Sequence, residues 1–453
     1  MEIFPYHVFV CEQRKPDGVP CCAARDSAAV LEVLRREVAQ HGLSETVQVT
    51  ACGSLGLCER GPNLVVYPEG VWYSGVTPAD VPELVESHFV HGVPVRRLVN
   101  TDAAAVKQEI QTNRNRHLQS VRAREAAGAM PDDLQQSLRA FQDSRVLLTA
   151  IELDVFTAIG KSATAAEVAA RVGANSRSTG MLLDAVVALG LLVKRDSVYS
   201  CTPAAERFFV AGAPFDSRAA MGHMIHLWTT WSSLTEAVRT GTTVCRGVNE
   251  RRDDTWTEPF IAAMHRIASE RAPHVTAAVG AAGLRRMLDV GGGSGAYSIA
   301  FAQAAPELEG DILDLGAVLS IAQRHIDAAG LTARIHTRAG DLRRDTLGQD
   351  YDLILVSAIC HMLSEEENLD LLQRCFAATA AGGRVVISDF ILEPDRTAPK
   401  FAALFALNML VGTPAGNSYT EAEYTQWLNA AGYGDVRRVR LPGTAHLMIG
   451  TKA

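Results

Sequence analysis

Apolar residues recur with two different periods along the chain, and the changes of period divide it into zones. Over residues 1–98, short β-type runs such as His7–Cys11 alternate with helical stripes such as Ser27–Gly42. Residues 99–130 are polar, rich in Ala, Arg and Gln, and poorly patterned. We therefore predict an α/β domain over the first zone and a partly helical linker over the second.

The third zone, residues 131–275, is predicted to be almost wholly helical. Its stretch Thr164–Pro203 shows the order helix, turn, helix and hairpin, which is typical of a winged helix. The second helix, over Ser178–Leu192, has no basic residue, whereas a helix that reads DNA needs exposed Arg, Lys, Asn or Gln. The pattern therefore favours a packing or dimerisation helix over a DNA-binding one.

The last zone, residues 276–453, alternates apolar β-type runs with helical patterns. This alternation indicates a doubly wound, Rossmann-like sheet with helices on both faces. The predicted fold class is thus α/β, with a helical winged-helix domain between two α/β domains.

Composition and charge narrow the class of protein further. The 453 residues are 47% hydrophobic and 21% charged, which is normal for globular domains. A net charge of −8 makes nucleic acid and anionic membranes poor partners. No run approaches a membrane span, and the first residues lack a signal-peptide pattern. We expect a cytoplasmic protein.

A glycine-rich turn follows the first apolar run of the last zone. Gly291, Gly293 and Gly295 are spaced G-x-G-x-G between a strand pattern and a helix pattern. Glycines let the backbone approach a ligand, and the helix N-terminus offers free N–H groups. A dinucleotide fingerprint would place a further glycine where Ala296 stands. By itself the loop fits a nucleotide, a flavin or S-adenosylmethionine.

Two carboxylates further along the chain help to decide which of these ligands the loop binds. Asp314 ends the second strand pattern, where a carboxylate can accept both ribose hydroxyls, and Asp341 ends the third, in position for an adenine amine. A pyrophosphate would gain from basic groups near the glycine loop, and none directly follow it. The pattern favours a nucleoside without phosphate.

From about Asp133 onward, the chain resembles the class I S-adenosylmethionine-dependent O-methyltransferases of small molecules. The resemblance rests on IELDVFTAI, ATAAEVAARVG, LLDAVVALGLL and YSCTPAAERF in the helical zone and on VGGGSG, DL and AGD in the last one. It implies that the winged helix is a dimerisation domain, that the protein is a homodimer, and that the cofactor is S-adenosylmethionine. The implied cofactor-binding residues are Gly291, Gly293, Gly295, Asp314, Asp341, Leu342 and Ser357.

The resemblance also implies a general base. In this family a histidine after the fourth strand deprotonates the substrate hydroxyl, and here it corresponds to His361. The acids that hold it correspond to Asp389 and to Ser418 or Asn417, so the second acid is replaced by a neutral group. Met362 also departs from the family pattern. O-methylation is favoured, and C-methylation of a reduced quinone or tetrapyrrole-like substrate is the alternative.

Three apolar stretches are candidate walls of a substrate pocket. They contain His, Met, Trp and Phe residues, which suit a flat aromatic substrate, and ordinary packing is the competing interpretation. The stretches are His223–Trp231, Phe260–Arg266 and Phe405–Pro414.

Five of the nine cysteines lie in the first 58 residues, which in a reducing compartment indicates metal or redox chemistry. The segment GPNLVVYPEGVWYSGVTPADVPELVESHFVHGVPVRRL is similar to the thioredoxin-like [2Fe–2S] ferredoxins. The resemblance implies a [2Fe–2S] cluster held by Cys11, by Cys22 or its neighbour Cys21, by Cys52 and by Cys58. The third ligand departs from the family, whose spacing would use the position of Ser54. A zinc or disulfide derivative and a degenerate interaction domain remain the alternatives.

These features combine into one functional hypothesis. The chain is expected to methylate a small, aromatic or polycyclic metabolite and to carry a fused [2Fe–2S] domain. That domain would transfer electrons from a partner protein or sense redox state. A non-enzymatic regulator is the alternative, and the missing basic residues in the winged helix argue against it.

Overall fold

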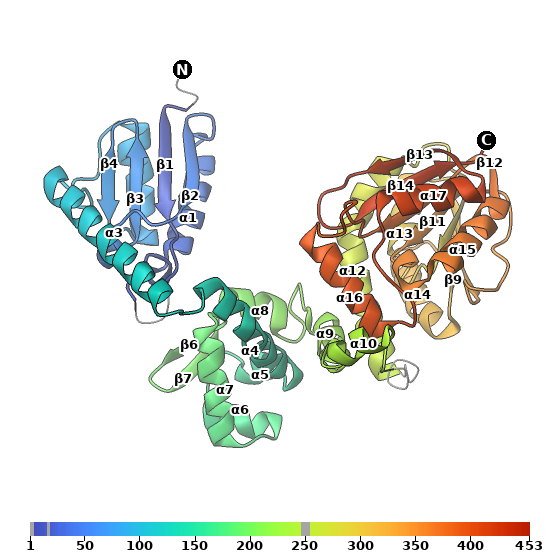
Figure 1. Ribbon diagram of the computed structural model, residues 1–453, viewed down its shortest axis with the longest axis horizontal. Coiled ribbons are helices and arrows are strands. Elements are labelled where there is room, and N and C mark those ends of the chain that lie inside the picture. Colours follow the sequence, from blue (N-terminus) through green and yellow to red (C-terminus); the bar gives the residue numbers. More distant parts are fainter. Residues whose placement is uncertain (1–3, 16–18, 246–253) are drawn as a thin grey trace. The chain divides into compact units, whose positions relative to one another are not determined.

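The computed structural model describes residues 4–15, 19–245 and 254–453, which form two compact units, Met1–Leu138 and Arg139–Ala453 (Figure 1). Over the described residues, no helix is both long enough and apolar enough to cross a membrane.

The first unit is built on a four-stranded sheet in the order β2-β1-β3-β4. Strand β1 is parallel to β2 and antiparallel to β3, which is antiparallel to β4. The strands are β1 (Tyr6–Cys11), β2 (Val47–Cys52), β3 (Asn63–Tyr67) and β4 (Val71–Ser74). The helical segments are α1 (Ser27–Gln40), α2 (Val81–Leu84), the π-helical turn η4 (Val85–Val90) and α3 (Ala103–Ala126). Because β1 and β2 are parallel, their C-terminal residues Cys11 and Cys52 lie side by side at one edge.

Helix α1 buries the stripe that the sequence predicts. Val30, Leu34 and Val38 are spaced four residues apart, so they share one face and join the core beneath the sheet. Strand β1 and helix α1 each end within two residues of the predicted ranges His7–Cys11 and Ser27–Gly42.

Helix α3 occupies most of the segment expected to be a linker. Asp102 caps it by accepting a hydrogen bond from the N–H of Ala105. The side-chain amide of Asn113 donates to the carbonyl of Gly56 at 2.8 Å, and Ile110 packs beside that glycine. The helix is thus attached to the loop that joins β2 to β3.

The second unit begins with a helical part that contains a small three-stranded sheet in the order β5-β7-β6. Its helices are α4 (Asp132–Glu152), which begins in the first unit, α5 (Val155–Ile159), α6 (Ala165–Val172), α7 (Ser176–Ala188) and α8 (Pro203–Phe209), and its strands are β5 (Ala163–Thr164), β6 (Leu192–Arg195) and β7 (Val198–Cys201). Helices α6 and α7 followed by the β6–β7 hairpin form the expected winged helix. Capping side chains of Thr164 and Asn175 start its two helices.

Three helices then lead into the last zone: α9 (Arg218–Trp231), α10 (Leu234–Thr240) and α12 (Asp254–Val279). A seven-stranded sheet follows in the order β10-β9-β8-β11-β12-β14-β13, in which only pairs that involve β14 are antiparallel. Its strands are β8 (Arg286–Val290), β9 (Glu309–Asp314), β10 (Ile335–Ala339), β11 (Tyr351–Ser357), β12 (Thr379–Asp389), β13 (Gly434–Val439) and β14 (His446–Thr451). Its helices are α13 (Ala296–Ala304), α14 (Gly316–Ala328), α15 (Glu365–Ala378), α16 (Lys400–Gly412) and α17 (Glu421–Ala431), with the 3-10 turn η5 (Cys360–Met362) after β11.

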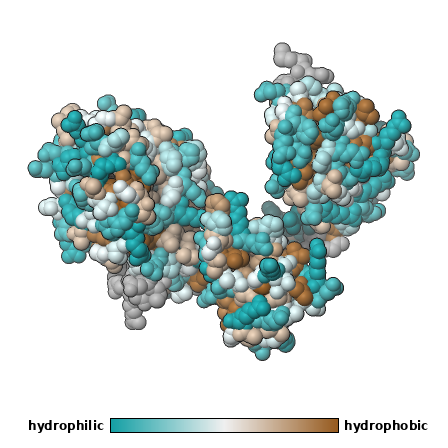
Figure 2. All heavy atoms as spheres, turned by 180° about the vertical axis from the view of Figure 1, so that it is seen from behind, coloured by the Kyte–Doolittle hydropathy of each residue, from teal (hydrophilic) through white to brown (hydrophobic). Residues whose placement is uncertain are grey.

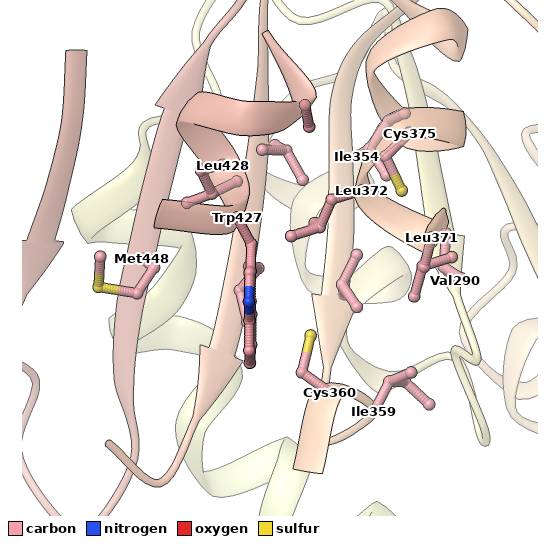
Figure 3. Packing of buried hydrophobic residues seen from close by; sticks show 14 of the residues in the cluster. Val290, Ile354, Ile359, Cys360, Leu371, Leu372, Cys375, Trp427, Leu428 and Met448 are labelled. Carbon is pink, nitrogen blue, oxygen red and sulfur yellow. The ribbon is translucent and has the colours of Figure 1, made fainter. Parts of the chain in front are cut away.

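Two hydrophobic clusters cover the two faces of this sheet. Figure 3 shows one of them, in which Leu371 and Cys375 of α15 and Trp427 of α17 pack over the strands. Cys360 and Cys375 are fully buried, and burial raises the pKa of Cys375 to about 12. These two thiols are core residues.

Candidate active site

The glycine loop joins β8 to α13, and two of its glycines are required by close neighbours. Gly291 has φ +67°, and a Cβ there would lie 2.3 Å from Cδ1 of Ile359. Gly295 has φ +77°, and a Cβ there would lie 2.8 Å from Cδ1 of Ile312. Gly293 also has positive φ but faces open space, with nothing within 4 Å of its Cβ position. The loop is closed beneath and open at its middle glycine, where a ligand can approach the backbone.

Asp314, the last residue of β9, faces this loop as predicted. Its Oδ2 accepts the N–H of Gly293 at 2.8 Å, and its Oδ1 accepts the N–H of Leu315 at 2.7 Å. Burial raises the pKa of the carboxyl, and the two backbone donors oppose that shift. The glycine loop and the carboxylate thus form one connected structure.

The residues that follow β10 lie near the same loop. Leu342 lies 3.5 Å from the Cβ position of Gly291. Asp341 uses its carboxylate within its own turn: Oδ1 accepts the N–H of Arg343, and Oδ2 accepts from Arg344 at 2.9 Å. The hydrogen bond from Arg343 leads the groups that lower the pKa of Asp341. Ser357, the remaining predicted residue, ends β11 and is half-buried.

Sequence reasoning missed one acid at this loop. Asp289 precedes the glycines on β8 and is almost fully buried. Its Oδ2 accepts the hydroxyl of Ser298 at 2.9 Å, whereas its Oδ1 has no hydrogen-bond partner. Burial raises its pKa to about 7. The sequence feature that could have identified Asp289 is an acidic residue inside an apolar strand pattern directly before G-x-G-x-G.

His361 lies on the turn η5 and is held by Asp389, the last residue of β12. The distance from its Nδ1 to Oδ1 of Asp389 is 2.7 Å, and its backbone N–H donates to Oδ2 at 3.1 Å. Both side chains are buried. The structure therefore brings together the predicted histidine and its first predicted acid.

The environment of Asp389 keeps it ionised. Burial alone would raise the pKa of this carboxyl, but His361 and donors from the N–H of Phe390 and the hydroxyl of Tyr424 bring it below its usual value. An ionised carboxylate only accepts, so Nδ1 of His361 carries a proton, and in the neutral ring Nε2 is then the nitrogen with the free lone pair. Tyr424, on α17, is a supporting residue that the sequence pattern did not indicate.

The expectation that Ser418 or Asn417 also holds the imidazole is wrong. The hydroxyl of Ser418 is buried without a hydrogen-bond partner, and the side chain of Asn417 accepts the N–H of Ser418. Asn417 instead donates its backbone N–H to the carbonyl of His361 at 2.9 Å. A short side chain on this loop does not reach the ring, and the loop supports the histidine through its backbone.

Aromatic rings surround the imidazole. The Phe405 ring meets it edge-on at 4.8 Å between centroids, and the Phe390 ring lies nearly parallel at 6.0 Å. Helices α9 and α16, which carry two of the predicted walls, are joined by a 2.8 Å hydrogen bond from Trp231 to Asn408. The predicted wall residues of these helices therefore do meet.

Of the four cysteines predicted to hold a cluster in the first unit, only some are in contact with one another. Cys11 and Cys22 share a hydrogen bond, which lowers the pKa of Cys11 to about 6, and Cys52 is paired with Cys11 in the sheet register. The thiol of Cys58 instead lies 3.5 Å from the hydroxyl of Ser54. In the described parts of the chain, no three His, Cys, Asp or Glu side chains are grouped so that they could hold a metal ion. Cys11 thus has both Cys22 and Cys52 as neighbours, whereas the contact of Cys58 is with Ser54.

Comparison with known proteins assigns the second unit. Residues 231–434 match the O-methyltransferase domain family, and residues 135–211 match the O-methyltransferase dimerisation domain family. Residues 1–134 lie outside both matches.

Two relatives and one solved structure illustrate the similarity. The chain is 38% identical to 3-hydroxy-5-methyl-1-naphthoate 3-O-methyltransferase of Streptomyces sahachiroi, over 68% of this chain and 92% of that protein. It is 31% identical to the tetracenomycin polyketide synthesis 8-O-methyl transferase TcmO of Streptomyces glaucescens, over 71% and 97%. Human N-acetylserotonin methyltransferase in complex with S-adenosylmethionine is 25% identical, with a TM-score of 0.64 over 71% of this chain and 96% of that one. The chain belongs to the S-adenosylmethionine-dependent O-methyltransferases.

Proposed function

We propose that this enzyme methylates a phenolic hydroxyl on a small fused-ring aromatic acceptor, with His361 as the general base. The observation that carries the proposal is the buried contact of His361 with Asp389 beside two aromatic rings. The names of the two Streptomyces relatives, a naphthoate and a polyketide methyltransferase, support a fused-ring acceptor.

The residues present fit the cofactor. Gly293 leaves its side of the loop open, Asp314 is a half-buried carboxylate suited to ribose hydroxyls, and Asp289 has an unpartnered oxygen. We assign Gly291, Gly295 and Leu342 to the same site because they border this loop. S-adenosylmethionine, when bound, supplies an electrophilic methyl group on a sulfonium.

His361 would remove the proton that the reaction must release. Its Nε2 lone pair takes the phenolic proton as the oxygen bonds to the methyl carbon and the carbon–sulfur bond breaks, which leaves a methyl ether and S-adenosylhomocysteine. The negative charge of Asp389 stabilises the imidazolium, which then releases the proton to solvent. The aromatic rings help to position the acceptor, and positioning contributes much of the rate.

We further propose that the enzyme is a homodimer. The match to the dimerisation domain supports this, and so do exposed apolar side chains on the winged-helix part, such as Phe141 at 57% and Met181 at 60%. Figure 2 shows brown hydrophobic patches on this part of the chain. Light scattering of the purified protein should give the mass of two chains, and a mass of one chain would contradict the proposal.

For the first unit we propose a thioredoxin-like domain that binds a [2Fe–2S] cluster. Its mixed four-stranded sheet and the neighbouring Cys11, Cys22 and Cys52 support this, and thiolates are the ligands that such clusters need. Among the described residues these thiols are not grouped closely enough to hold a metal ion, so the site is not preformed. Methyl transfer needs no electrons, and no step of it involves the cluster.

The cluster would then serve an electron-transfer partner or sense redox state. Anaerobic purification followed by visible absorption, electron paramagnetic resonance after dithionite and iron and sulfide assays tests its presence. A colourless, iron-free protein would overturn the assignment.

Incubation of the purified enzyme with S-adenosylmethionine labelled in the methyl group tests the main proposal. We expect label in 3-hydroxy-1-naphthoate or 2-naphthol as a methyl ether. Intact binding of S-adenosylhomocysteine without methylation of either hydroxyarene would contradict the proposed acceptor class.

A further inference from the structure

Arg271 of helix α12 is a half-buried cation with few partners. Its Nη2 donates to the hydroxyl of Thr444 at 2.9 Å, and its guanidinium lies 5.3 Å from the centre of the Phe390 ring. Among the described residues it forms no ion pair. By contrast, the more deeply buried Arg438 pairs with two glutamates.

This arrangement leaves most of the guanidinium without a partner. An arginine has five N–H donors in a planar fork that matches a carboxylate, and one neutral hydroxyl accepts from it here. Burial lowers the pKa of Arg271, which shows that its surroundings disfavour the charge. An anion that arrived beside it would therefore be bound without first displacing another carboxylate.

The position of Arg271 connects it to both halves of the active site. Phe390, over which it lies, directly follows Asp389 and stands beside the His361 ring. Arg271 also interacts electrostatically with Tyr297, which lies in the first turn of α13 after the glycine loop, with Asp389 and with the adjacent Glu270. The cation is thus near the acid that holds the general base and near the helix that follows the cofactor loop.

We propose that Arg271 binds a carboxylate in the active site of this enzyme. The carboxylate belongs either to the acceptor, which would then be a hydroxyarene carboxylate, or to the methionyl end of the cofactor. If the carboxylate belongs to the acceptor, this inference rests on the proposed methylation of a hydroxyarene. If it belongs to the cofactor, cofactor binding alone tests the inference.

The test compares Arg271→Gln and Arg271→Lys with the wild type in two measurements. One is the Kd of S-adenosylhomocysteine by calorimetry. The other is the KM for 3-hydroxy-1-naphthoate and for 2-naphthol, which differ only in the carboxylate. Arg36→Gln is the control, because Arg36 lies on α1 of the first unit and pairs with Glu37.

If Arg271 binds the carboxylate of the acceptor, Arg271→Gln should raise the KM for 3-hydroxy-1-naphthoate at least tenfold. The KM for 2-naphthol and the Kd of S-adenosylhomocysteine should then stay within twofold. If Arg271 binds the carboxylate of the cofactor, the Kd of S-adenosylhomocysteine should rise at least tenfold. Arg271→Lys should lose part of either effect, since lysine lacks the planar fork.

If the Kd and both KM values stay within twofold, the proposal is wrong. If the wild type methylates neither acceptor, the proposed acceptor class fails, and the Kd of the Arg271→Gln enzyme alone decides this inference. Circular dichroism of each variant checks that it is folded.

Discussion

Asp389 holds His361 at two points, by Oδ1 to the ring nitrogen Nδ1 at 2.7 Å and by Oδ2 to the backbone N–H at 3.1 Å. The first contact fixes the tautomer, and the second fixes the turn that carries the ring. One carboxylate therefore sets both the direction in which Nε2 points and the tautomer of the neutral ring.

Replacing the base tests its role directly. His361→Ala should lower kcat by about 100-fold or more, the usual contribution of a general base. The Kd of S-adenosylhomocysteine should not change, because the ring contacts Asp389 and phenylalanines rather than the glycine loop. Unchanged turnover would show that positioning alone carries the reaction.

Asp389→Asn separates ring orientation from charge. The amide can keep the same shape, but it can donate to Nδ1 and so leave the proton on Nε2, which then cannot accept one. We expect kcat to fall by about 100-fold or more with little change in KM. A variant with wild-type kcat would show that the carboxylate has only a structural role.

Gly291→Ala can be compared with a glycine of similar backbone shape. Both Gly291 and Gly382 have positive φ, but a Cβ at Gly382 meets nothing within 4 Å. Each alanine adds backbone strain of about 1 kcal/mol, and only Gly291→Ala also forces Ile359 to move. Gly291→Ala should therefore lose more stability in urea and weaken S-adenosylhomocysteine binding, whereas Gly382→Ala should bind normally. Equal losses of stability at the two sites would argue against the close contact.

Burial of Asp289 predicts a pH dependence of stability. Its pKa is about 7 in the folded chain, and near ~4 when unfolded. Between these values the folded state holds a proton that the unfolded state has lost, so the free energy of unfolding falls as pH rises. Asp289→Asn lacks this contribution, and its stability relative to wild type should increase from pH 4 to 7 and then level off. Urea titrations at several pH values measure it, and a constant difference would be the contrary result.

The loop between β2 and β3 gives a test of the cluster ligands. Cys52→Ala should lose or strongly perturb the visible spectrum of the purified protein, because Cys52 lies beside Cys11. Ser54→Ala should leave the spectrum intact. The reverse pattern would mean that Ser54 retains the ligand position of the ferredoxin family.

Local sequence patterns predicted many helices and strands of this fold, because the spacing of apolar residues within a segment reflects the period of the element that it forms. The stripe of α1 and the alternation of strands and helices around the glycine loop follow from periodicity, and parallel pairing then brings the ends of β8 and β9 together. This is why Asp314 could be placed against the loop before the structure was known.

The remaining features depend on contacts that no local pattern encodes. Whether Asp341 turns to a ligand or to Arg344 depends on the loop conformation, and so does the failure of Ser418 to reach His361. Helix α3 has a single buried apolar residue, Val106, so its sequence shows almost no stripe. Its attachment through Asn113 to Gly56 links positions far apart in the chain.

Gly416 limits how the acceptor range of this enzyme can be redesigned. A Cβ there would lie 2.4 Å from the carbonyl oxygen of His361, so any larger residue would displace the base itself. Phe401 and Leu404 of α16 are about half exposed, and the Phe401 ring lies against those of Phe390 and Phe405. Libraries that vary those two positions and leave Gly416 fixed can search for new acceptors while the proton-accepting nitrogen stays in place.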